Sequence, residues 1–389
     1  MTRPLFLDHH STTPLDPRAF EAMRPFFEAA FGNPHSADHA YGWEAEAAVE
    51  AARRDVAALI GARPGEIVFT SGATESNNLA IRGAAARLPE GRRHLVASAI
   101  EHPCVAAVMD LLEGRGFPVT RVMPDRDGIV SAEAVAAAIR PETGLVSVMA
   151  ANHEIGTLQP IGDIGAVTRP RGIVFHSDAA QAAGKVPLAV EPAGVDLLSL
   201  SAHKMYGPKG IGALYVRRGV GLEPLFAGGG QERGLRSGTV PAPLAVGFGA
   251  AARIARAEMA EEADRLRGLR DRLLDRLSAA IPGVAVNGSL TARLPHNLDL
   301  RLPGVVAVDL IHALKDRVAI SAGSACASAS LEPSPVLRAI GLSDEEALAS
   351  IRIGLGRWTS AEDVDRAAAA IAEAWAALTG QACRVEFEA

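Results

Sequence analysis

The chain has 389 residues, of which 48% are hydrophobic, 22% are charged and 4% are aromatic. This apolar fraction can supply a sizeable core and excludes a mostly disordered protein, and the length suits two or three domains. Lysine and arginine total 39 against 45 aspartate and glutamate residues, a net charge of −6, so a nucleic-acid binder that depends on a broadly basic face is disfavoured.

The cysteines and the N-terminal segment narrow the class of protein further. Cys104, Cys326 and Cys383 lie far apart and form no Cys-x-x-Cys pair, which disfavours a disulfide framework and a thiolate zinc site. The N-terminus lacks the apolar core of a signal peptide, and no run of about eighteen apolar residues predicts a membrane helix. We expect a cytoplasmic protein with no metal site, no membrane contact and no direct nucleic-acid contact.

Short aliphatic runs alternate with alanine-rich helical stretches along the first two-thirds of the chain. Continuous apolar strands separated by amphipathic helices are typical of a parallel sheet that is covered on both faces. The last two runs are joined by a segment too short for a helical crossover, so those two strands should pair antiparallel. The expected strands lie at residues 66–70, 94–98, 119–123, 145–149, 172–176, 196–200 and 212–216, with helices that include 74–88 and 132–139.

The character of the sequence changes after about residue 250. A long charged helix is expected over residues 250–280 and ends at an Ile-Pro-Gly step. Beyond it the sequence predicts strands in VAV (residues 284–286) and SIRIGLG, a helix in VAVDLIHALKD and a final helix from Ser360. We therefore expect a large α/β domain over residues 13–260 and a smaller α+β domain over residues 261–389, which the N-terminal segment 1–12 joins.

The segment SGATES, residues 71–76, follows the first expected strand and opens a helix. Backbone N–H groups at such a helix start bind phosphate, and a glycine with small hydroxyl residues favours that use. The alternative is an ordinary Ser or Thr cap of the helix. The spacing is neither that of a P-loop nor that of a dinucleotide fingerprint.

Two further side chains stand at the carboxyl ends of expected strands, the edge at which open α/β sheets bind ligands. Asp178 follows the strand at 172–176, and Lys204, one of only four lysines, follows the strand at 196–200. Taken alone, Asp178 is either a helix cap or the partner of a protonated ring nitrogen. Lys204, taken alone, is either a solvated loop residue or the amine that forms an imine. Together with a phosphate-binding helix start they match what pyridoxal phosphate (PLP) needs.

Three other residues, His102, Cys326 and Arg352, each have a functional and a structural interpretation. His102, after the strand at 94–98, is either a structural histidine or a ring that stacks on a cofactor and moves protons. Cys326 lies in the small, polar segment SAGSACASASLEPS, where a thiol acts as a nucleophile or stays inert. Arg352 in SIRIGLGR clamps a carboxylate or forms a structural ion pair, and Cys104 is expected to be a small buried hydrophobe.

Specific motifs run through the chain from LDHHSTTPLDP to SIRIGLGRWTSAEDVD. Among them are GNPHS, EIVFTSGATESNN, IEHP, ANHEIGTLQPIG, HSDAAQAAGK, SLSAHKMYGPKGIGALY, GGGQERGLRSGT and AGSACAS. In these motifs the sequence resembles the cysteine desulfurases, the IscS/NifS branch of the class V aminotransferase superfamily. The resemblance implies a PLP-dependent transferase of fold type I, a homodimer, and conversion of L-cysteine to L-alanine with the sulfur left on an enzyme cysteine.

The resemblance also implies roles for individual residues. Lys204 matches the lysine that holds PLP as an aldimine, Asp178 the partner of its ring nitrogen, and Cys326 the nucleophile that becomes a persulfide. His102 matches the residue that stacks on the ring and carries protons. Further matched positions are Gln181 at the phenolic oxygen, Ala73, Thr74, Ser201, His203 and, across the dimer interface, Thr239 at the phosphate, Asn152 at the cofactor, and Asn33, Asn152 and Arg352 at the substrate.

The long segment after Cys326 resembles the IscS/NifS type, in which it carries sulfur outward. We therefore expect transfer to a sulfur-acceptor protein, such as an iron–sulfur scaffold or a thiolation relay protein. One departure from the family pattern is His153 in ANHEIG, where the family usually shows a second Asn. The alternatives are another class V enzyme (a selenocysteine or cysteine-sulfinate lyase, or an aminotransferase) and a non-catalytic partner of sulfur assembly. The Cys326 segment counts against an aminotransferase, and the presence of Lys204 and Asp178 counts against a non-catalytic partner.

Overall fold

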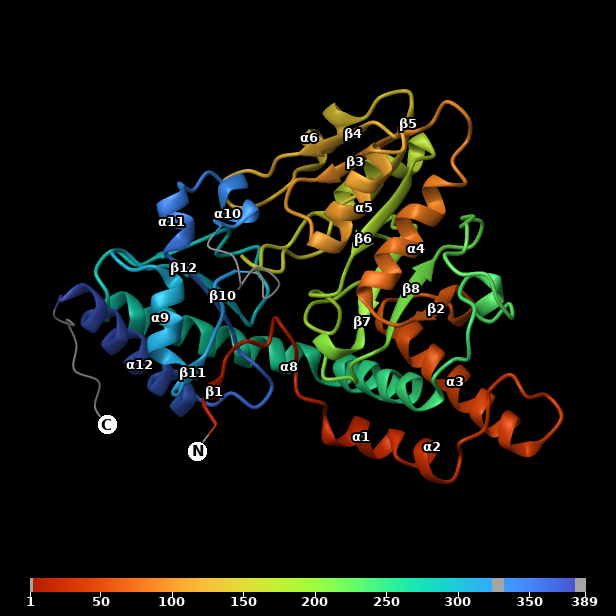
Figure 1. Ribbon diagram of the computed structural model, residues 1–389, viewed down its shortest axis with the longest axis horizontal. Helices are drawn as coiled ribbons and strands as arrows, with labels where there is room; N and C mark the ends of the chain where they lie inside the picture. Colours follow the sequence, from red (N-terminus) through yellow and green to blue (C-terminus); the bar gives the residue numbers. More distant parts are fainter. Residues whose placement is uncertain (1–2, 324–331, 382–389) are drawn as a thin grey trace.

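The computed structural model of the protein describes residues 3–323 and 332–381. Figure 1 shows two parts that share one long helix, α8 (Ala242–Ala280). One part is layered around a large sheet, and the smaller part holds the C-terminal elements together with the N-terminal strand β1 (Leu5–Phe6). The helix expected over residues 250–280 is present and begins earlier in the chain than predicted.

The large sheet has seven strands in the order β2-β8-β7-β6-β5-β3-β4. Strands β3 to β7 pair parallel with one another, whereas β8 runs antiparallel to both β2 and β7. The predicted mostly parallel sheet and the antiparallel pair at the end of the series are therefore confirmed. The strands are β2 (Ile67–Thr70), β3 (His94–Ser98), β4 (Val119–Val122), β5 (Thr143–Ser147), β6 (Val174–Asp178), β7 (Leu197–Ser201) and β8 (Gly212–Val216).

Helices cover both faces of this sheet because its central strands are apolar on both sides. All residues of β3, β5 and β7 are buried. An apolar cluster on one face packs α4 (Ala73–Ala85) and α5 (Pro103–Glu113) against the strands. The cluster on the other face is formed with α3 (Ala40–Leu59), α6 (Ala132–Ala138), α7 (Ile161–Thr168) and the first half of α8.

The smaller part contains an antiparallel sheet in the order β12-β10-β9 and a parallel pair, β1 with β11 (Val318–Ala319). A third apolar cluster fills it, and Trp375 is its largest buried side chain. The sequence predicts β9 (Ala285–Val286) and β12 (Ser350–Gly354) but misses β10 (Asn297–Arg301), because its sequence NLDLR is unusually polar for a buried strand. The helices are α9 (Ala307–Leu314), α10 (Pro335–Ala339), α11 (Asp344–Leu348) and α12 (Ala361–Thr379).

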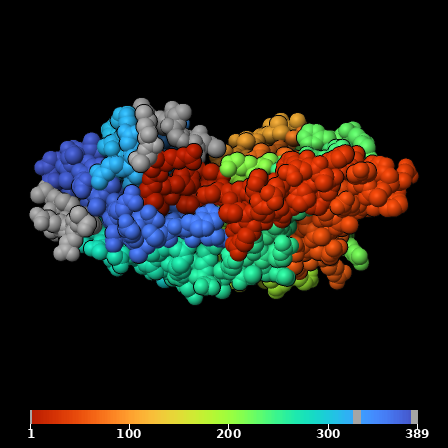
Figure 2. All heavy atoms as spheres, turned by 90° about the horizontal axis from the view of Figure 1, so that it is seen from below, coloured from red at the N-terminus to blue at the C-terminus, as the bar shows by residue number. Residues whose placement is uncertain are grey.

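The N-terminal segment connects the two parts. After pairing with the smaller part through β1, it contacts the large part, where the Thr13 N–H donates to the His203 carbonyl at 2.9 Å. It then forms α1 (Pro17–Met23) and α2 (Pro25–Glu28). In the space-filling view of Figure 2, these N-terminal residues, in red, run along one face of the molecule. Within residues 3–323 and 332–381, no helix combines the length and apolar character needed to cross a bilayer.

Candidate active site

A cavity of about 470 Å³ lies at the carboxyl edge of the large sheet. Asp178 is the last residue of β6 and Lys204 follows β7, so two adjacent parallel strands bring both side chains to this edge. The cavity unites most of the residues that the sequence predicts for the site. They are Ala73, Thr74, His102, Asp178, Gln181, Ser201, His203, Lys204 and Arg352.

The Lys204 amine reaches the N-terminal segment. Its Nζ donates to the carbonyl oxygen of Ser11 at 2.8 Å and to that of His10. The turn that carries it is held by the same segment, because the Thr13 hydroxyl donates to the carbonyl of His203 at 2.9 Å. Residues far apart in the sequence thus fix the position of the lysine at the edge of the sheet.

The Asp178 carboxylate is buried, with 5% of the residue exposed. Its Oδ2 accepts from Asn77 Nδ2 at 2.7 Å, and its Oδ1 accepts from the Ala180 N–H at 2.9 Å. These two hydrogen bonds fix the direction of the carboxylate at the cavity wall. Asn77 lies on α4, so the carboxylate and the start of that helix are positioned together.

Helix α4 begins at the cavity without a side-chain cap. Its cap residue is Gly72, with φ +153°, which makes no side-chain cap hydrogen bond to the first turn. The first backbone bond of the helix runs from the Ser76 N–H to the Gly72 carbonyl at 3.0 Å, so the N–H groups before it have no partner within the helix. The structure therefore favours the phosphate-binding interpretation of SGATES over an ordinary Ser or Thr cap.

His102 caps α5 at the cavity. Its Nδ1 accepts from the Cys104 N–H at 3.2 Å, which leaves Nε2 to carry the proton in the neutral ring. Burial, and next the neighbouring His153, lower the pKa of His102 to about 4, so the ring is neutral at pH 7. Burial raises the pKa of the Cys104 thiol to about 12, which keeps that thiol protonated.

Gln181 and Arg352 meet the N-terminal segment at the cavity. Gln181 Oε1 lies 3.2 Å from His10 Nδ1, and its Nε2 donates to the His10 carbonyl at 3.1 Å. Arg352, from β12 of the smaller part, donates from Nη2 to Asp8 Oδ1 and to Ser11 Oγ, both at 3.0 Å. Arg352 thus forms an ion pair, as its structural interpretation suggests, and it also lines the cavity, while its role on a substrate carboxylate stays a prediction.

Three predicted site residues, Asn152, Asn33 and Thr239, do not line this cavity. Asn152 is fully buried and its amide is engaged with backbone, accepting from the Glu154 N–H at 2.9 Å, so it holds the loop after β5. Asn33 and Thr239 are exposed and lie outside the cavity lining. Cys326 lies outside the described residues.

Sequence reasoning missed several residues that line the cavity, among them His10, Ser11 and Lys209, and noted His153 only as a departure. The signal for the first two is the polar run HHSTT directly after the apolar LFL, which places polar groups at the end of β1. Among residues 3–323 and 332–381, no group of three or more His, Cys, Asp or Glu side chains could hold a metal ion.

Comparison with known proteins places this geometry in a family context. The chain matches the family described as "Aminotransferase class-V" over residues 5–367. It is 54% identical over 365 residues to "Cysteine desulfurase, mitochondrial" of Drosophila melanogaster, covering 93% of this chain and 79% of the relative. It is 53% identical over 375 residues to "Cysteine desulfurase IscS" of Anaeromyxobacter sp. (strain Fw109-5), covering 96% and 93%. A solved structure titled "NIFS-LIKE PROTEIN" matches with a TM-score of 0.89 and 37% identity, covering 95% of this chain and 98% of the other.

Proposed function

Because this chain belongs to the aminotransferase class-V family and is a cysteine desulfurase, we propose that it acts on L-cysteine in the cavity between Asp178 and Lys204 and leaves the sulfur as a persulfide on Cys326. The product from the carbon skeleton is L-alanine. One observation supports this assignment most strongly. A strand-end lysine, a strand-end carboxylate, an uncapped helix start and an arginine line a single cavity.

The family implies dependence on PLP, and the residues of the cavity fit that cofactor. The start of α4 has backbone N–H groups without a side-chain cap, as a phosphate group requires, and Ser201 and His203 line the same cavity. Arg352 Nε and Asn77 Oδ1 are buried and have no hydrogen-bond partner among the described residues. Buried polar atoms of this kind are satisfied when a polar ligand binds.

When bound, PLP supplies the electron sink for chemistry at the Cα of an amino acid. In our proposal, Lys204 would hold the cofactor through its amine and would move the proton at the substrate Cα. Asp178 would keep the cofactor ring nitrogen protonated, and Gln181 would hold its phenolic oxygen. The neutral His102 carries protons at Nε2, and Arg352 binds the substrate carboxylate.

We further propose that the protein is a homodimer in which Thr239 of one subunit reaches the phosphate site of the other. The exposure of Thr239, outside the cavity of its own chain, supports this arrangement. Large exposed aromatic side chains supply apolar surface for an interface on the first helices of the chain, namely Phe20, Phe27, Tyr41 and Trp43. Light scattering at micromolar concentration measures the oligomeric state directly.

For Asn33 and Asn152 we retain the role of substrate contacts, and for Asn152 also that of a cofactor contact, as predictions. We also propose that the protein acts in the cytoplasm, and that the sulfur passes to an acceptor protein of iron–sulfur cluster assembly or thiolation. The scarcity of cysteine supports a cytoplasmic protein. The resemblance of the segment after Cys326 to the IscS/NifS type supports sulfur transfer to an acceptor protein. Affinity capture from native extract, with the persulfide trapped, identifies the acceptor.

Two substitutions test the proposed roles. We expect Lys204→Ala to abolish turnover and to remove the visible absorption of PLP bound through its aldehyde. Lys315 is an exposed lysine on the smaller part, and we expect Lys315→Ala to leave both unchanged.

We expect Cys326→Ala to keep the visible absorption of bound PLP and to lose sulfide release from cysteine, whereas Cys383→Ala releases sulfide at the wild-type rate. Wild-type sulfide release by Cys326→Ala in the presence of a reductant would show that another group takes the sulfur.

A further inference from the structure

His153 is a buried histidine to which the reaction described above assigns no role. Only 4% of it is exposed, and neither ring nitrogen has a hydrogen-bond partner among the described residues. It lines the 470 Å³ cavity and also a second cavity of about 660 Å³ beside it. A buried polar ring that finds no hydrogen-bond partner in the described part of the chain costs free energy, so the position of His153 between two cavities calls for a functional explanation.

The imidazole stands between another imidazole and a carboxylate. On one side its ring meets His102 edge to face, with the ring centroids 5.1 Å apart and the planes at 73°. On the other side its Nε2 lies 3.4 Å from Glu154 Oε1. Its backbone carbonyl accepts from Arg352 Nη1 at 2.8 Å, which holds the loop in place. His102, His153 and Glu154 thus follow one another, from the 470 Å³ cavity to the buried carboxylate.

Glu154 is suited to stabilise a positive charge on His153. It is 3% exposed, and its Oε2 accepts the hydroxyl hydrogen of Ser334 at 2.6 Å. Burial by itself raises the pKa of Glu154, but the nearby His153 ring, the hydrogen bond from Ser334 and the charge of Arg352 lower it overall. The carboxylate is therefore an anion at neutral pH, within reach of the His153 ring.

We propose that His153 is a positioning residue for the proton chemistry of His102, because it takes up a proton as an imidazolium paired with Glu154 and thereby determines whether His102 holds one. Like charges repel, so at this distance a proton on one buried imidazole disfavours a proton on the other. A proton on His153 keeps His102 neutral and ready to accept. This role rests on the proposed function, in which His102 carries protons.

Other charged groups also surround the pair. On the cavity side, Asp178 favours a positive charge on His102 and Lys204 opposes it. On the other side, the charge of Arg352 is balanced by Asp8, whose Oδ1 lies 3.0 Å from its Nη2. Burial raises the pKa of Glu101, which lines the second cavity, to about 8, so it adds little negative charge at neutral pH. Glu154 is therefore the anion placed to pair with His153.

Nitrogen NMR of the holoenzyme, labelled at its histidine rings, tests this role. His153→Asn removes the competing imidazole, so we expect the pH midpoint of His102 to rise by roughly half a unit to one unit. Glu154→Gln removes the stabilising anion, so the pair should take up its proton at a lower pH than in the wild type. The exposed His312→Asn is the matched control, with the wild-type titration of His102.

The acid limb of kcat/KM should move with the NMR midpoint, to higher pH in His153→Asn. A His102 midpoint that is unchanged by His153→Asn, or a pair that titrates as in the wild type in Glu154→Gln, overturns the proposal. If one variant does not fold, the other decides the outcome alone, because each has its own expected sign. His102→Gln distinguishes a failure of the proposed function from a failure of this inference. Wild-type turnover in that variant would reject the proton role of His102. The effect of His153→Asn on the NMR midpoint of His102 would still test the role of His153.

Discussion

At the scale of the residue, burial rather than residue type decides which groups of the site carry charge. Glu101 illustrates this, because its Oε1 accepts from the Ser98 hydroxyl at 2.6 Å and from the Met149 N–H at 2.8 Å, while its Oε2 has no partner among the described residues. Burial raises the pKa of Glu101 to about 8, and the nearby charge of Asp178 acts in the same direction. The folded protein therefore keeps this carboxyl group largely protonated at neutral pH.

We expect Glu101→Gln to flatten the dependence of stability on pH. The folded-state pKa of Glu101 lies above its ordinary value of 4.5, so its contribution to stability is complete below that pH and is lost as the pH rises toward about 8. A neutral amide removes this loss. The free energy of unfolding, from urea denaturation at a series of pH values between about 5 and 8, should then fall less than in the wild type.

The matched control for this prediction is Glu46→Gln, at an exposed position of α3. Its stability should follow the wild-type dependence on pH. Parallel curves for Glu101→Gln and the wild type across this range would contradict the assignment of a protonated Glu101.

At the scale of the element, an outer strand of the large sheet is closed by side chains. Among the described strands, β2 pairs only with β8, and the Phe69 N–H on its other side donates to Glu232 Oε2 at 2.7 Å. Arg53 of α3 donates to the Ile67 carbonyl at 2.8 Å and to both Glu232 oxygens at 2.7 Å. This satisfies backbone groups that an edge strand otherwise exposes, and it fastens the segment that carries Thr239.

We expect Glu232→Gln to cost about 3–5 kcal/mol of unfolding free energy, because it removes the buried counter-charge of the Arg53 guanidinium and leaves only the ion pair with the partly exposed Glu50. The side chains of Arg53 and Glu232 are 5% and 2% exposed, so water screens little of this loss. Asp264→Asn breaks an exposed pair with Arg267 and should cost at most about 1 kcal/mol. Urea denaturation measures both, and equal losses in the two variants would argue against the role of burial.

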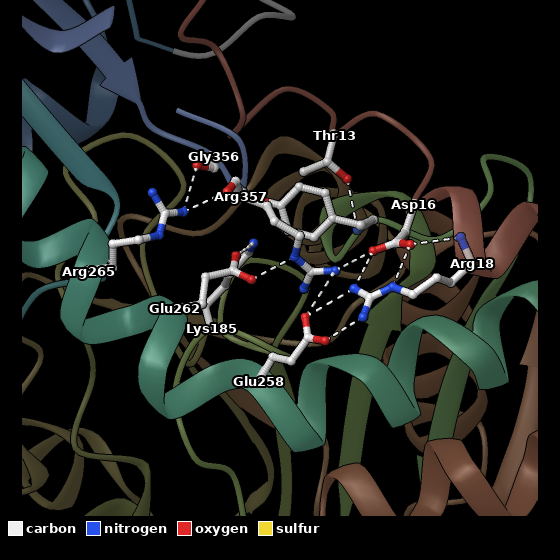
Figure 3. A network of polar contacts seen from close by, with 10 residues as sticks. Thr13, Asp16, Arg18, Lys185, Glu258, Glu262, Arg265, Gly356 and Arg357 are labelled. Atoms are coloured by element: carbon white, nitrogen blue, oxygen red, sulfur yellow. Dashed lines mark hydrogen bonds and ion pairs between the residues drawn. The ribbon is translucent and has the colours of Figure 1, made fainter. Parts of the chain in front are cut away.

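At the scale of the whole molecule, one arginine joins segments from three regions of the chain. Figure 3 shows Arg357, which follows β12, between Asp16 of the N-terminal segment and Glu262 of α8. Its Nη1 lies 2.6 Å from Asp16 Oδ2, its Nε donates to Glu262 Oε2 at 2.7 Å, and its backbone N–H donates to the Tyr206 hydroxyl at 2.6 Å. Tyr206 follows the turn of Lys204, so this network connects the two parts of the molecule to the active site.

We expect Arg357→Ala to destabilise the protein by about 3–5 kcal/mol, because it leaves Asp16 and Glu262 buried with fewer partners. The unfolding transition, followed by tryptophan fluorescence and by far-ultraviolet circular dichroism, should move to lower urea. Arg272→Ala removes an exposed pair between α8 and α12 and serves as the control, with a loss of at most about 1 kcal/mol. A loss in Arg357→Ala no larger than in this control would mean that the network does not hold the parts together.

The sequence by itself was sufficient to predict the large sheet and to place Asp178 and Lys204 at the ends of two of its strands. Strands β3 and β8 match their predicted bounds, because continuous apolar runs with alanine-rich helices between them have one favourable arrangement. The same pattern places Asp178 and Lys204 at one edge of the sheet. The family, and with it the cysteine desulfurase activity, could be predicted from local motifs. The domain boundary near residue 260 stays a prediction, since α8 crosses it without a break.

Only the tertiary structure decided which polar residues share the cavity. It brings His10 and Ser11 to Lys204, turns the Asn152 amide toward backbone, and sets His153 between His102 and Glu154. Most of these contacts join residues that are distant in the sequence, and a polar side chain has no periodic pattern that reveals its partner. Apolar periodicity records which face of an element is buried, whereas the pairing of buried polar groups depends on how the elements meet.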